Sequence, residues 1–483
     1  MTGIIAILIA LALLIYLAYR GLSLLILAPA LAALVALVSV EAPLFASYTQ
    51  VFMGSAGDFI VRFFPLFLLG AIFGKLMEDS GCADVLAQAI VARLGDAKAV
   101  LAVVLSCGVM TYGGVSLFVV AFAVYPIAAA LFRQADLPKR LIPGTIALGA
   151  FTFTMTALPG TPAIQNAIPM PYFGTSAFAA PGLGILTGLV MLILGQAWLN
   201  YRVKQAKSAG EGYGDHPDDA PQVDKDLRER SSGEGFDLME LPTEETPRDR
   251  PPLALAVLPI VLVIALNLLF TAVIIPAMDT DYLAEPQYGA TSIDSLRGVW
   301  SIIGALVISI LVLVFTNLKR LPRLTGTLDS GANASVLPIF NTASLVGFGS
   351  VVASLAAFDT ISGWVTGMGG DNPLISLAIA VNLLAGMTGS ASGGMSIALS
   401  TLGDTYLAMG QAAGISPELM HRVTAVATGG LDALPHNGAV ITLLSICGLT
   451  HRQAYLDIAV VAMLVPIIAL AFLITVGTVF GTF

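Results

Sequence analysis

Residues 429–440 read GGLDALPHNGAV and lie inside a segment that is otherwise apolar enough to be buried in a membrane. The paired glycines and Pro435 disrupt a helix, and Asp432, His436 and Asn437 place polar groups beside the interruption. In lipid, unpaired backbone groups persist only where protein covers them or where they line a wet cavity. The stretch therefore predicts a helix broken at membrane depth beside a functional site.

The composition around this stretch is that of a polytopic membrane protein. The chain has 483 residues, of which 57% are hydrophobic and 11% charged, and its mean hydropathy is +0.88. These values lie far outside those of soluble domains. Cys82, Cys107 and Cys447 lack CxxC spacing, so we expect neither a disulfide framework nor a zinc site. No metal, organic cofactor or nucleic-acid partner is expected, and residues 3–19 are expected to stay as a helix rather than be cleaved as a signal.

Apolar runs predict a series of full spans and two hairpins. Full spans are expected at 3–19, 21–40, 59–78, 141–170, 181–201, 253–276, 298–317, 335–358, 421–446 and 454–480. Residues 98–132 and 374–409 each hold two runs that look short for a crossing and are split by Gly, Ser and Thr. Each pair therefore predicts a re-entrant hairpin that enters and leaves by one face.

The distribution of basic residues orients these spans. With both termini outside, 14 of the 22 Lys and Arg residues fall at cytoplasmic ends, and three, Arg62, Arg297 and Arg422, fall at outer ends. Residues 202–251 hold 13 Asp and Glu and 8 Lys and Arg in a Pro-, Gly- and Ser-rich run. This acidic stretch predicts a mostly disordered cytoplasmic loop.

Three short motifs recur in the same order along the chain. They are FFPLF (63–67) with VLPIF (336–340), GGVS (113–116) with GGMS (393–396), and ALPG (157–160) with ALPH (433–436). An odd number of full spans precedes the second copy, which inverts it. We therefore predict an all-α fold of two inverted repeats, residues 1–201 and 252–483. Each repeat is expected to have five transmembrane helices, one re-entrant hairpin and one broken helix, at 141–170 and 421–446.

The breaks predict an anion site without cationic side chains. No Lys or Arg is expected near the middle of a span, whereas half-helix N-termini carry partial positive charge and free N–H donors. We predict substrate contacts at the hairpin tips and after the breaks, at Thr111, Tyr112, Gly113, Gly114, Ser116, Thr161, Gln165, Asn166, Ser390, Ser392, Gly393, His436 and Asn437. Taken singly, such hydroxyl and amide groups also serve only to bond their own backbone or to join neighbouring helices.

Asp432 and His436 distinguish the second break from the first, where Thr156 and Gly160 stand at the matching positions. A carboxyl and an imidazole at membrane depth are groups that can load and release a proton, so we predict a proton-coupling role for both. The structural alternative is a helix cap for Asp432 and a hydrogen bond to a freed carbonyl for His436.

The chain resembles the gluconate permease (GntP) family of the ion transporter superfamily. The resemblance is carried by TFTMTALPGTPAIQNAIP (152–169), YFGTSAFAAPGLG (172–184), GGLDALPHNGAVITLL (429–444) and GLTHRQAY (448–455). It implies a bacterial inner-membrane symporter that uses the proton gradient to carry gluconate, 3-hydroxybutyrate or a related small organic acid anion. It also implies a lipid-embedded homodimer that works by an elevator-like motion, with both termini periplasmic.

Three alternatives remain open at this point. The superfamily also includes sodium-coupled carboxylate carriers, whose ions sit at hairpin tips comparable to TGSASGG (388–394). Ser390 or Ser392 with His436 would supply the hydroxyl and base of an intramembrane serine protease, although a hydrolase needs no second, inverted copy of its site. Broken helices and hairpins also suit a channel, which saturable accumulation against a gradient would exclude.

Overall fold

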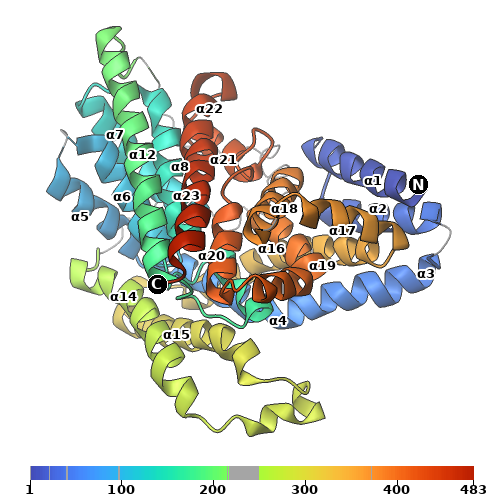
Figure 1. Ribbon diagram of the computed structural model, residues 1–483. Coiled ribbons are helices and arrows are strands. Elements are labelled where there is room, and N and C mark those ends of the chain that lie inside the picture. The colour runs from blue at the N-terminus through green and yellow to red at the C-terminus, as the bar shows by residue number, and fades with distance from the viewer. Residues whose placement is uncertain are drawn as a thin grey trace.

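The protein is all-helical in the part that the computed structural model describes, residues 2–20, 22–39, 42–95, 98–214, 216, 250–370 and 372–483 (Figure 1). Most of the acidic loop predicted at 202–251 lies outside these residues. Among these described residues, six helices are long and apolar enough to cross a membrane, at Leu44–Asp79, Pro181–Ser208, Leu253–Ala277, Ile293–Arg320, Leu324–Ala353 and His451–Phe480. The fold is that of a polytopic membrane protein, as predicted.

The first half runs from an N-terminal helix pair to a long helix that leads toward the acidic loop. Its helices are α1 (Thr2–Tyr19), α2 (Leu24–Ser39), α3 (Leu44–Ala46), α4 (Met53–Asp79), α5 (Cys82–Leu94), α6 (Ala99–Tyr112), α7 (Leu117–Gln134), α8 (Ile142–Ala150), α9 (Phe153–Thr156), α10 (Ile164–Ala167), α11 (Met170–Phe173) and α12 (Pro181–Ser208). A π-helical turn at Ser47–Phe52 joins α3 to α4. Short helices and turns thus replace a continuous helix after Ala150.

The second half repeats this order. Its helices are α14 (Leu253–Leu269), α15 (Ile293–Asn317), α16 (Leu324–Ala353), α17 (Ala356–Gly367), α18 (Pro373–Thr388), α19 (Ala391–Ala412), α20 (Pro417–Ala427), α21 (Gly438–Ile446), α22 (His451–Ala459) and α23 (Val465–Phe480). The chain between α20 and α21 forms turns rather than helix. In both halves a helix pair is followed by a long helix, a short helix, a hairpin and an interrupted helix.

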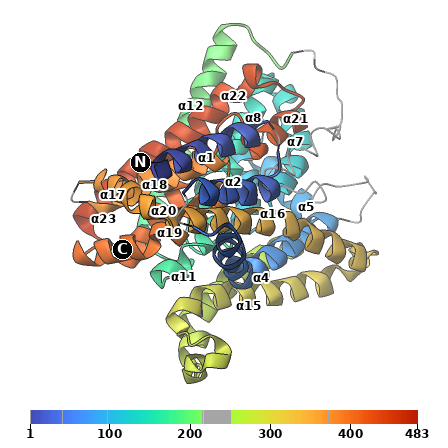
Figure 2. The same cartoon turned by 90° about the vertical axis from the view of Figure 1, so that its right-hand side faces the viewer.

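The two halves interlock through their long helices. α4 packs along α16, and each also packs against the helix pair of the other half, because α2 contacts α16 and α15 contacts α4. Figure 2 shows α1, α2 and α16 running across the molecule in neighbouring layers. The hairpins α6–α7 and α18–α19 pack on opposite sides of this centre, and α12 lies beside α23 (Figure 1). Segments distant in sequence therefore meet in the middle of the protein.

Several predicted spans differ from the observed helices. The helix predicted at 59–78 begins much earlier, because α4 continues back through Gly57, Gly54 and the π-helical turn. The span predicted at 335–358 is wrong, since α16 ends at Ala353 and a new helix, α17, starts at Ala356. The short helices α5 and α17 were not predicted. Both are shorter than a membrane crossing, so a search for spans passes over them.

Asp457 joins three segments at one end of the α12–α23 layer. Its side chain is buried and accepts hydrogen bonds from Trp198 Nε1 at 3.0 Å, from Arg202 Nε at 2.8 Å and from Arg140 Nη1 at 3.4 Å. Arg140 also donates from Nε and Nη2 to the two oxygens of Glu211, at 2.6 and 2.7 Å. The cluster ties α22 to α12 and to the chain entering α8.

We expect Asp457→Asn to lower the free energy of unfolding by about 3 kcal/mol, because it removes the buried carboxylate that two guanidinium groups share. Glu211→Gln should cost about 1 kcal/mol or less, since this pair is partly exposed. Thermal unfolding in detergent measures both. The Arg140 hydrogen bond holds the pKa of Glu211 below its usual value of 4.5, so its contribution is present above that value and is lost on acidification. Equal stability losses in the two variants would contradict this assignment.

Candidate functional site

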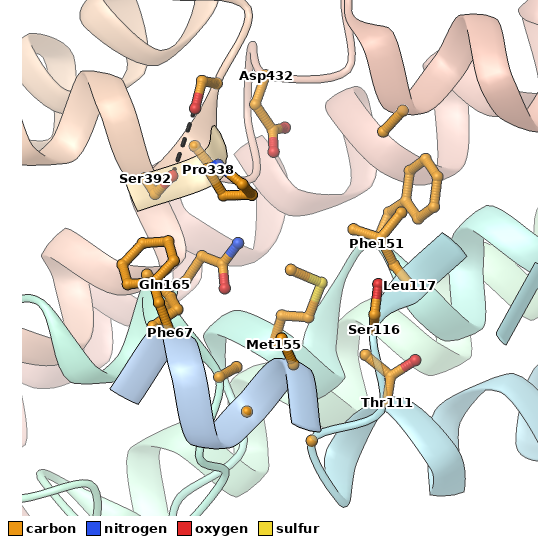
Figure 3. A pocket seen from close by; sticks show the side chains of 18 of the residues that line it. Phe67, Thr111, Ser116, Leu117, Phe151, Met155, Gln165, Pro338, Ser392 and Asp432 are labelled. Carbon is orange, nitrogen blue, oxygen red and sulfur yellow. Dashed lines mark hydrogen bonds between the residues drawn. The ribbon is translucent and has the colours of Figure 1, made fainter. Parts of the chain in front are cut away.

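A cavity of about 280 Å³ lies between the two halves. Both hairpin tips, both interrupted helices and the two long helices α4 and α16 contribute to its wall. Its lining residues include Leu66, Phe67, Gly70, Ala71, Thr111, Gly114, Ser116, Phe151, Met155, Gln165, Ala334, Ser335, Pro338, Ser390, Ser392, Asp432, Asn437 and Ala439. Figure 3 shows Asp432 and Ser392 facing Gln165, Met155, Ser116 and Thr111 across this space. Segments spread over most of the chain thus surround one site.

The first hairpin tip is fastened to the first break. Tyr112 Oη donates a hydrogen bond of 2.6 Å to the Pro159 carbonyl. Gly114 adopts a φ of +95°, and a Cβ there would lie 2.7 Å from Pro162 Cγ. Only glycine therefore lets the tip turn and approach the break this closely. Tip and break form one wall of the cavity.

The second tip and the second break meet through Asn437. Asn437 Nδ2 donates a 2.6 Å hydrogen bond to the Gly389 carbonyl, at the turn between α18 and α19. Asn437 Oδ1 accepts from the amides of Ala439 and Val440, at 2.7 and 3.2 Å, and so caps α21. One side chain thus fixes both the start of α21 and the position of the hairpin tip. In the first half Tyr112 likewise joins the tip to the break, but it caps no helix.

Three helices of eight residues or more begin at the cavity wall. α7 starts after Ser116, α19 after Ser390 and α21 after Asn437, and each of these N-cap residues lines the cavity. The first amides of a helix lack intrahelical partners, and the helix dipole makes that end partially positive. Together the three N-termini favour a negatively charged group in the cavity.

Hydroxyl groups add directional contacts. Thr111 Oγ1 is buried and, within the described residues, has no hydrogen-bond partner, although Thr111 lines the cavity. Ser390 Oγ accepts from the Gly393 amide at 3.1 Å and lies 3.4 Å from Ser392 Oγ (Figure 3). The hydroxyl of Ser390 therefore already caps α19, whereas that of Thr111 is buried next to the cavity.

The structure brings together eight of the predicted site residues at the cavity wall. They are Thr111, Gly114, Ser116, Gln165, Ser390, Ser392, Asp432 and Asn437. Asp432 is partly exposed, and in Figure 3 its carboxylate points into the cavity. The other predicted residues do not belong to the wall. They are Tyr112, Gly113, Thr161, Asn166, Gly393 and His436.

Four of these other residues make contacts next to the wall. Tyr112 bonds Pro159, and Thr161 Oγ1 accepts from the Ala163 amide at 3.3 Å. His436 packs against the second tip, because a Cβ on Gly389 would lie 3.3 Å from His436 Cδ2. Gly113 packs against the side chain of Ile260. Their predicted role as direct substrate contacts stays a prediction, and their contacts in the structure shape the tips and breaks.

The motif GGMS lies elsewhere in its hairpin than GGVS. Gly113 and Gly114 turn between α6 and α7, whereas Gly393 and Gly394 lie within α19. A Cβ on Gly394 would lie 2.2 Å from the Ala385 amide nitrogen, so this glycine lets α18 and α19 pack closely. The second tip is formed by Gly389 and Ser390 instead.

Arg422 lies deeper inside the protein than the sequence predicts. This residue was placed at an outer end, but it lies inside α20 and is completely buried. Its Nη1 donates to the Thr156 carbonyl at 3.1 Å and to Asn166 Oδ1 at 3.0 Å. A guanidinium therefore touches the first break. Its five hydrogen bonds reach four oxygens, the carbonyls of Thr156, Ala177 and Ala179 and the Asn166 side chain, which explains how it is accommodated.

The lining residues on α4 and α16 were not predicted from the sequence. Leu66 and Phe67 belong to FFPLF, and Pro338 belongs to VLPIF. The repeat of these motifs was the available signal. Within the described residues, no group of three or more His, Cys, Asp and Glu could hold a metal ion. Cys82, Cys107 and Cys447 are buried and free.

An all-helical membrane fold with an internal cavity between two structurally similar halves is typical of transporters. The chain is 43% identical over 474 residues to YxjC of Bacillus subtilis (strain 168), an uncharacterized transporter, with 95% of this chain and 96% of that one covered. The chain belongs to the same family as YxjC and is a transporter rather than an enzyme. An uncharacterized transporter of Haemophilus influenzae is 30% identical over 140 residues, covering 29% of this chain and 33% of that one. No protein-family model matches.

Two solved structures share the fold. The YdaH transporter of Alcanivorax borkumensis, described as having an unusual topology, superposes with a TM-score of 0.54 at 16% identity and covers 97% of this chain and 98% of its own. MtrF of Neisseria gonorrhoeae, described within a class of antimetabolite efflux pumps, gives 0.52 at 14% identity, over 91% and 85% of the two chains. At these identities the likeness concerns the fold alone.

Proposed function

We propose that the protein is a secondary active symporter that carries a small hydroxy-carboxylate, of the gluconate or 3-hydroxybutyrate type, together with a proton. The observation that carries the proposal is the convergence of the α7, α19 and α21 N-termini on one cavity. Helix N-termini bind carboxylates, and hydroxyl groups at the wall such as that of Ser392 match a hydroxylated substrate. The cavity lies at the small end of the usual range for ligand sites, which suits a small metabolite.

Asp432 supplies a route to proton coupling. Its carboxylate and a bound carboxylate anion would share the cavity, and two like charges about 4 Å apart repel by about 4 kcal/mol at an effective dielectric of about 20. Protonation of Asp432 removes this repulsion, so substrate and proton bind together. His436 lies behind the second tip and supports the same assembly. It is a second proton-linked group on the route of the same proton.

The position of the cavity favours an elevator-like motion. Its wall joins the hairpins and breaks to α4 and α16, which form the centre of the contacts between the halves. Hairpins and breaks moving as one body along α4 and α16 would carry the substrate across. We further propose inverted repeats at 1–201 and 252–483, an inner-membrane location with both termini periplasmic, and a homodimer. The motif resemblance to gluconate permeases supports these points.

Uptake by proteoliposomes tests the proposal. An inward proton gradient without sodium should drive saturable accumulation of gluconate or 3-hydroxybutyrate above the external concentration, and a proton ionophore should abolish it. Sodium coupling is the nearest alternative, since the second tip, residues 388–394, resembles those of sodium-coupled carriers. An absolute requirement for sodium would show that sodium, rather than a proton, is the coupling ion. Absence of carboxylate transport under every gradient would contradict the account as a whole.

A further inference from the structure

Arg422 is the largest completely buried side chain in the described part of the chain. Its hydrogen bonds go to uncharged oxygens of the first half. Nε and Nη2 donate to the Ala179 carbonyl at 3.2 and 2.8 Å, and Nη2 also reaches the Ala177 carbonyl at 3.5 Å. Nη1 donates to Thr156 O and Asn166 Oδ1. Arg422, a residue of the second half, therefore donates hydrogen bonds to backbone carbonyls at and after the first break, where regular helix is interrupted.

The contacts of Arg422 lie one residue away from the cavity wall at two places. Thr156 follows Met155, and Asn166 follows Gln165; both Met155 and Gln165 line the cavity. Arg422 therefore holds the break on either side of its proline-containing turn. A shift of the guanidinium would move both wall residues.

His421 extends the connection. Its Nδ1 lies 2.6 Å from Thr175 Oγ1, and its Nε2 lies 3.2 Å from Asn166 Oδ1. Asn166 Nδ2 in turn donates to the carbonyls of Thr161 and Ala177, each at 3.0 Å. The amide of Asn166 thus joins α20 to Thr161 within the first break and to Ala177 in the chain after it. This arrangement explains why Asn166 points away from the cavity.

The second break is held differently. Tyr455 Oη donates to the Ala433 carbonyl at 3.1 Å, and His451 Nε2 lies 2.8 Å from the Pro435 carbonyl. Both side chains come from α22 of the same half. The first break therefore depends on a cation of the opposite half, whereas the second is fastened within its own half.

We propose that Arg422 is a positioning residue that holds the first break in its cavity-lining shape and joins the two breaks into one body. The fork of the guanidinium matches several carbonyl oxygens at once, whereas a lysine ammonium has three donors and no such geometry. The proposed effect of Arg422 on the shape of the first break rests only on the hydrogen bonds described above. Its consequence for uptake rests on the proposed function.

Thiol labelling tests the shape without any substrate. Gln165→Cys reports on the first break and Ser392→Cys on the second tip, and the native cysteines are buried. Adding Arg422→Lys should speed labelling of Gln165→Cys by a membrane-impermeant methanethiosulfonate about tenfold, because lost hydrogen bonds raise the population of open states. Labelling of Ser392→Cys should change less than about twofold. Unchanged labelling of Gln165→Cys in folded Arg422→Lys protein would overturn the proposal.

Arg297→Lys is the matched control. Arg297 Nε donates at 2.8 Å to the Thr271 carbonyl, and neither residue lines the cavity. It should leave labelling at both sites unchanged, and an equal acceleration by Arg297→Lys would also overturn the proposal. Asn166→Leu is a second variant, which should speed labelling at Gln165→Cys even if Arg422→Lys does not fold. If wild-type protein carries gluconate, Arg422→Lys should raise KM more than it lowers the maximal rate. If it does not, the labelling result still decides.

Discussion

Asp432→Asn is expected to abolish proton-driven accumulation of the substrate while leaving substrate exchange in place. The asparagine keeps the size of the side chain and stays neutral, so the cavity still accepts an anion, but no proton is loaded or released with it. The binding energy of the anion then no longer depends on protonation at this position. The expected loss of accumulation is large because the substitution uncouples transport from the proton gradient rather than weakening a single contact.

Two proteoliposome assays separate these outcomes. Net uptake under a proton gradient should fall to the level of empty liposomes, whereas exchange of labelled for unlabelled gluconate should persist. Asp404→Asn is the control, since Asp404 is an exposed acid on α19 outside the cavity wall. Full accumulation in Asp432→Asn would remove Asp432 from the coupling role. Loss of both uptake and exchange would instead assign Asp432 to substrate binding.

Gly394→Ala is expected to abolish transport and to destabilise the protein, although it adds one methyl group. A Cβ at this position would lie 2.2 Å from the Ala385 amide nitrogen and 2.4 Å from the Leu384 carbonyl carbon. These are backbone atoms of the facing helix, so α18 and α19 must separate. Overpacking of this kind costs about 1–3 kcal/mol. Separation would also displace Ser390 and Ser392, which line the cavity.

Gly363→Ala serves as the control for this prediction. Gly363 lies within α17, and a Cβ there would meet no atom within 4 Å. Alanine in a helix is favoured over glycine by about 1 kcal/mol, so this variant should be as stable as the native protein or slightly more so. Thermal unfolding and gluconate uptake measure both variants. Native transport by Gly394→Ala would show that the hairpin tolerates a wider separation than its packing indicates.

The sequence was informative where a residue type forces one backbone outcome. Composition alone indicates the membrane class, and the prolines and glycines of 151–169 and 429–440 mark segments where the structure has turns in place of regular helix. The convergence of Ser116, Ser390 and Asn437 on one cavity follows from placing the polar residues of two related halves at their breaks. These predictions rested on the residue types at each break and on the internal repeat.

The sequence was less informative where tertiary packing, rather than local sequence, determines the position of a residue. Arg422 looks like an ordinary basic residue at the end of a span, and only the folded chain shows that carbonyls of the opposite half surround it. The pair Gly393 and Gly394 looks like a turn, yet it is helical, and a Cβ on Gly394 would collide with the backbone of α18. α17 lies beyond the end of α16 because the chain turns at Leu355, which no strong local signal marks.

Protection of Ser392→Cys from thiol labelling tests the anion site most directly. We expect gluconate or 3-hydroxybutyrate to slow the reaction of this thiol with a methanethiosulfonate in a saturable manner. Sorbitol, which is similarly hydroxylated but uncharged, should not slow it. Protection would locate a carboxylate beside the N-terminus of α19. Labelling that no carboxylate slows, or that sorbitol slows equally, would contradict the claim that converging helix ends bind an anion in this cavity.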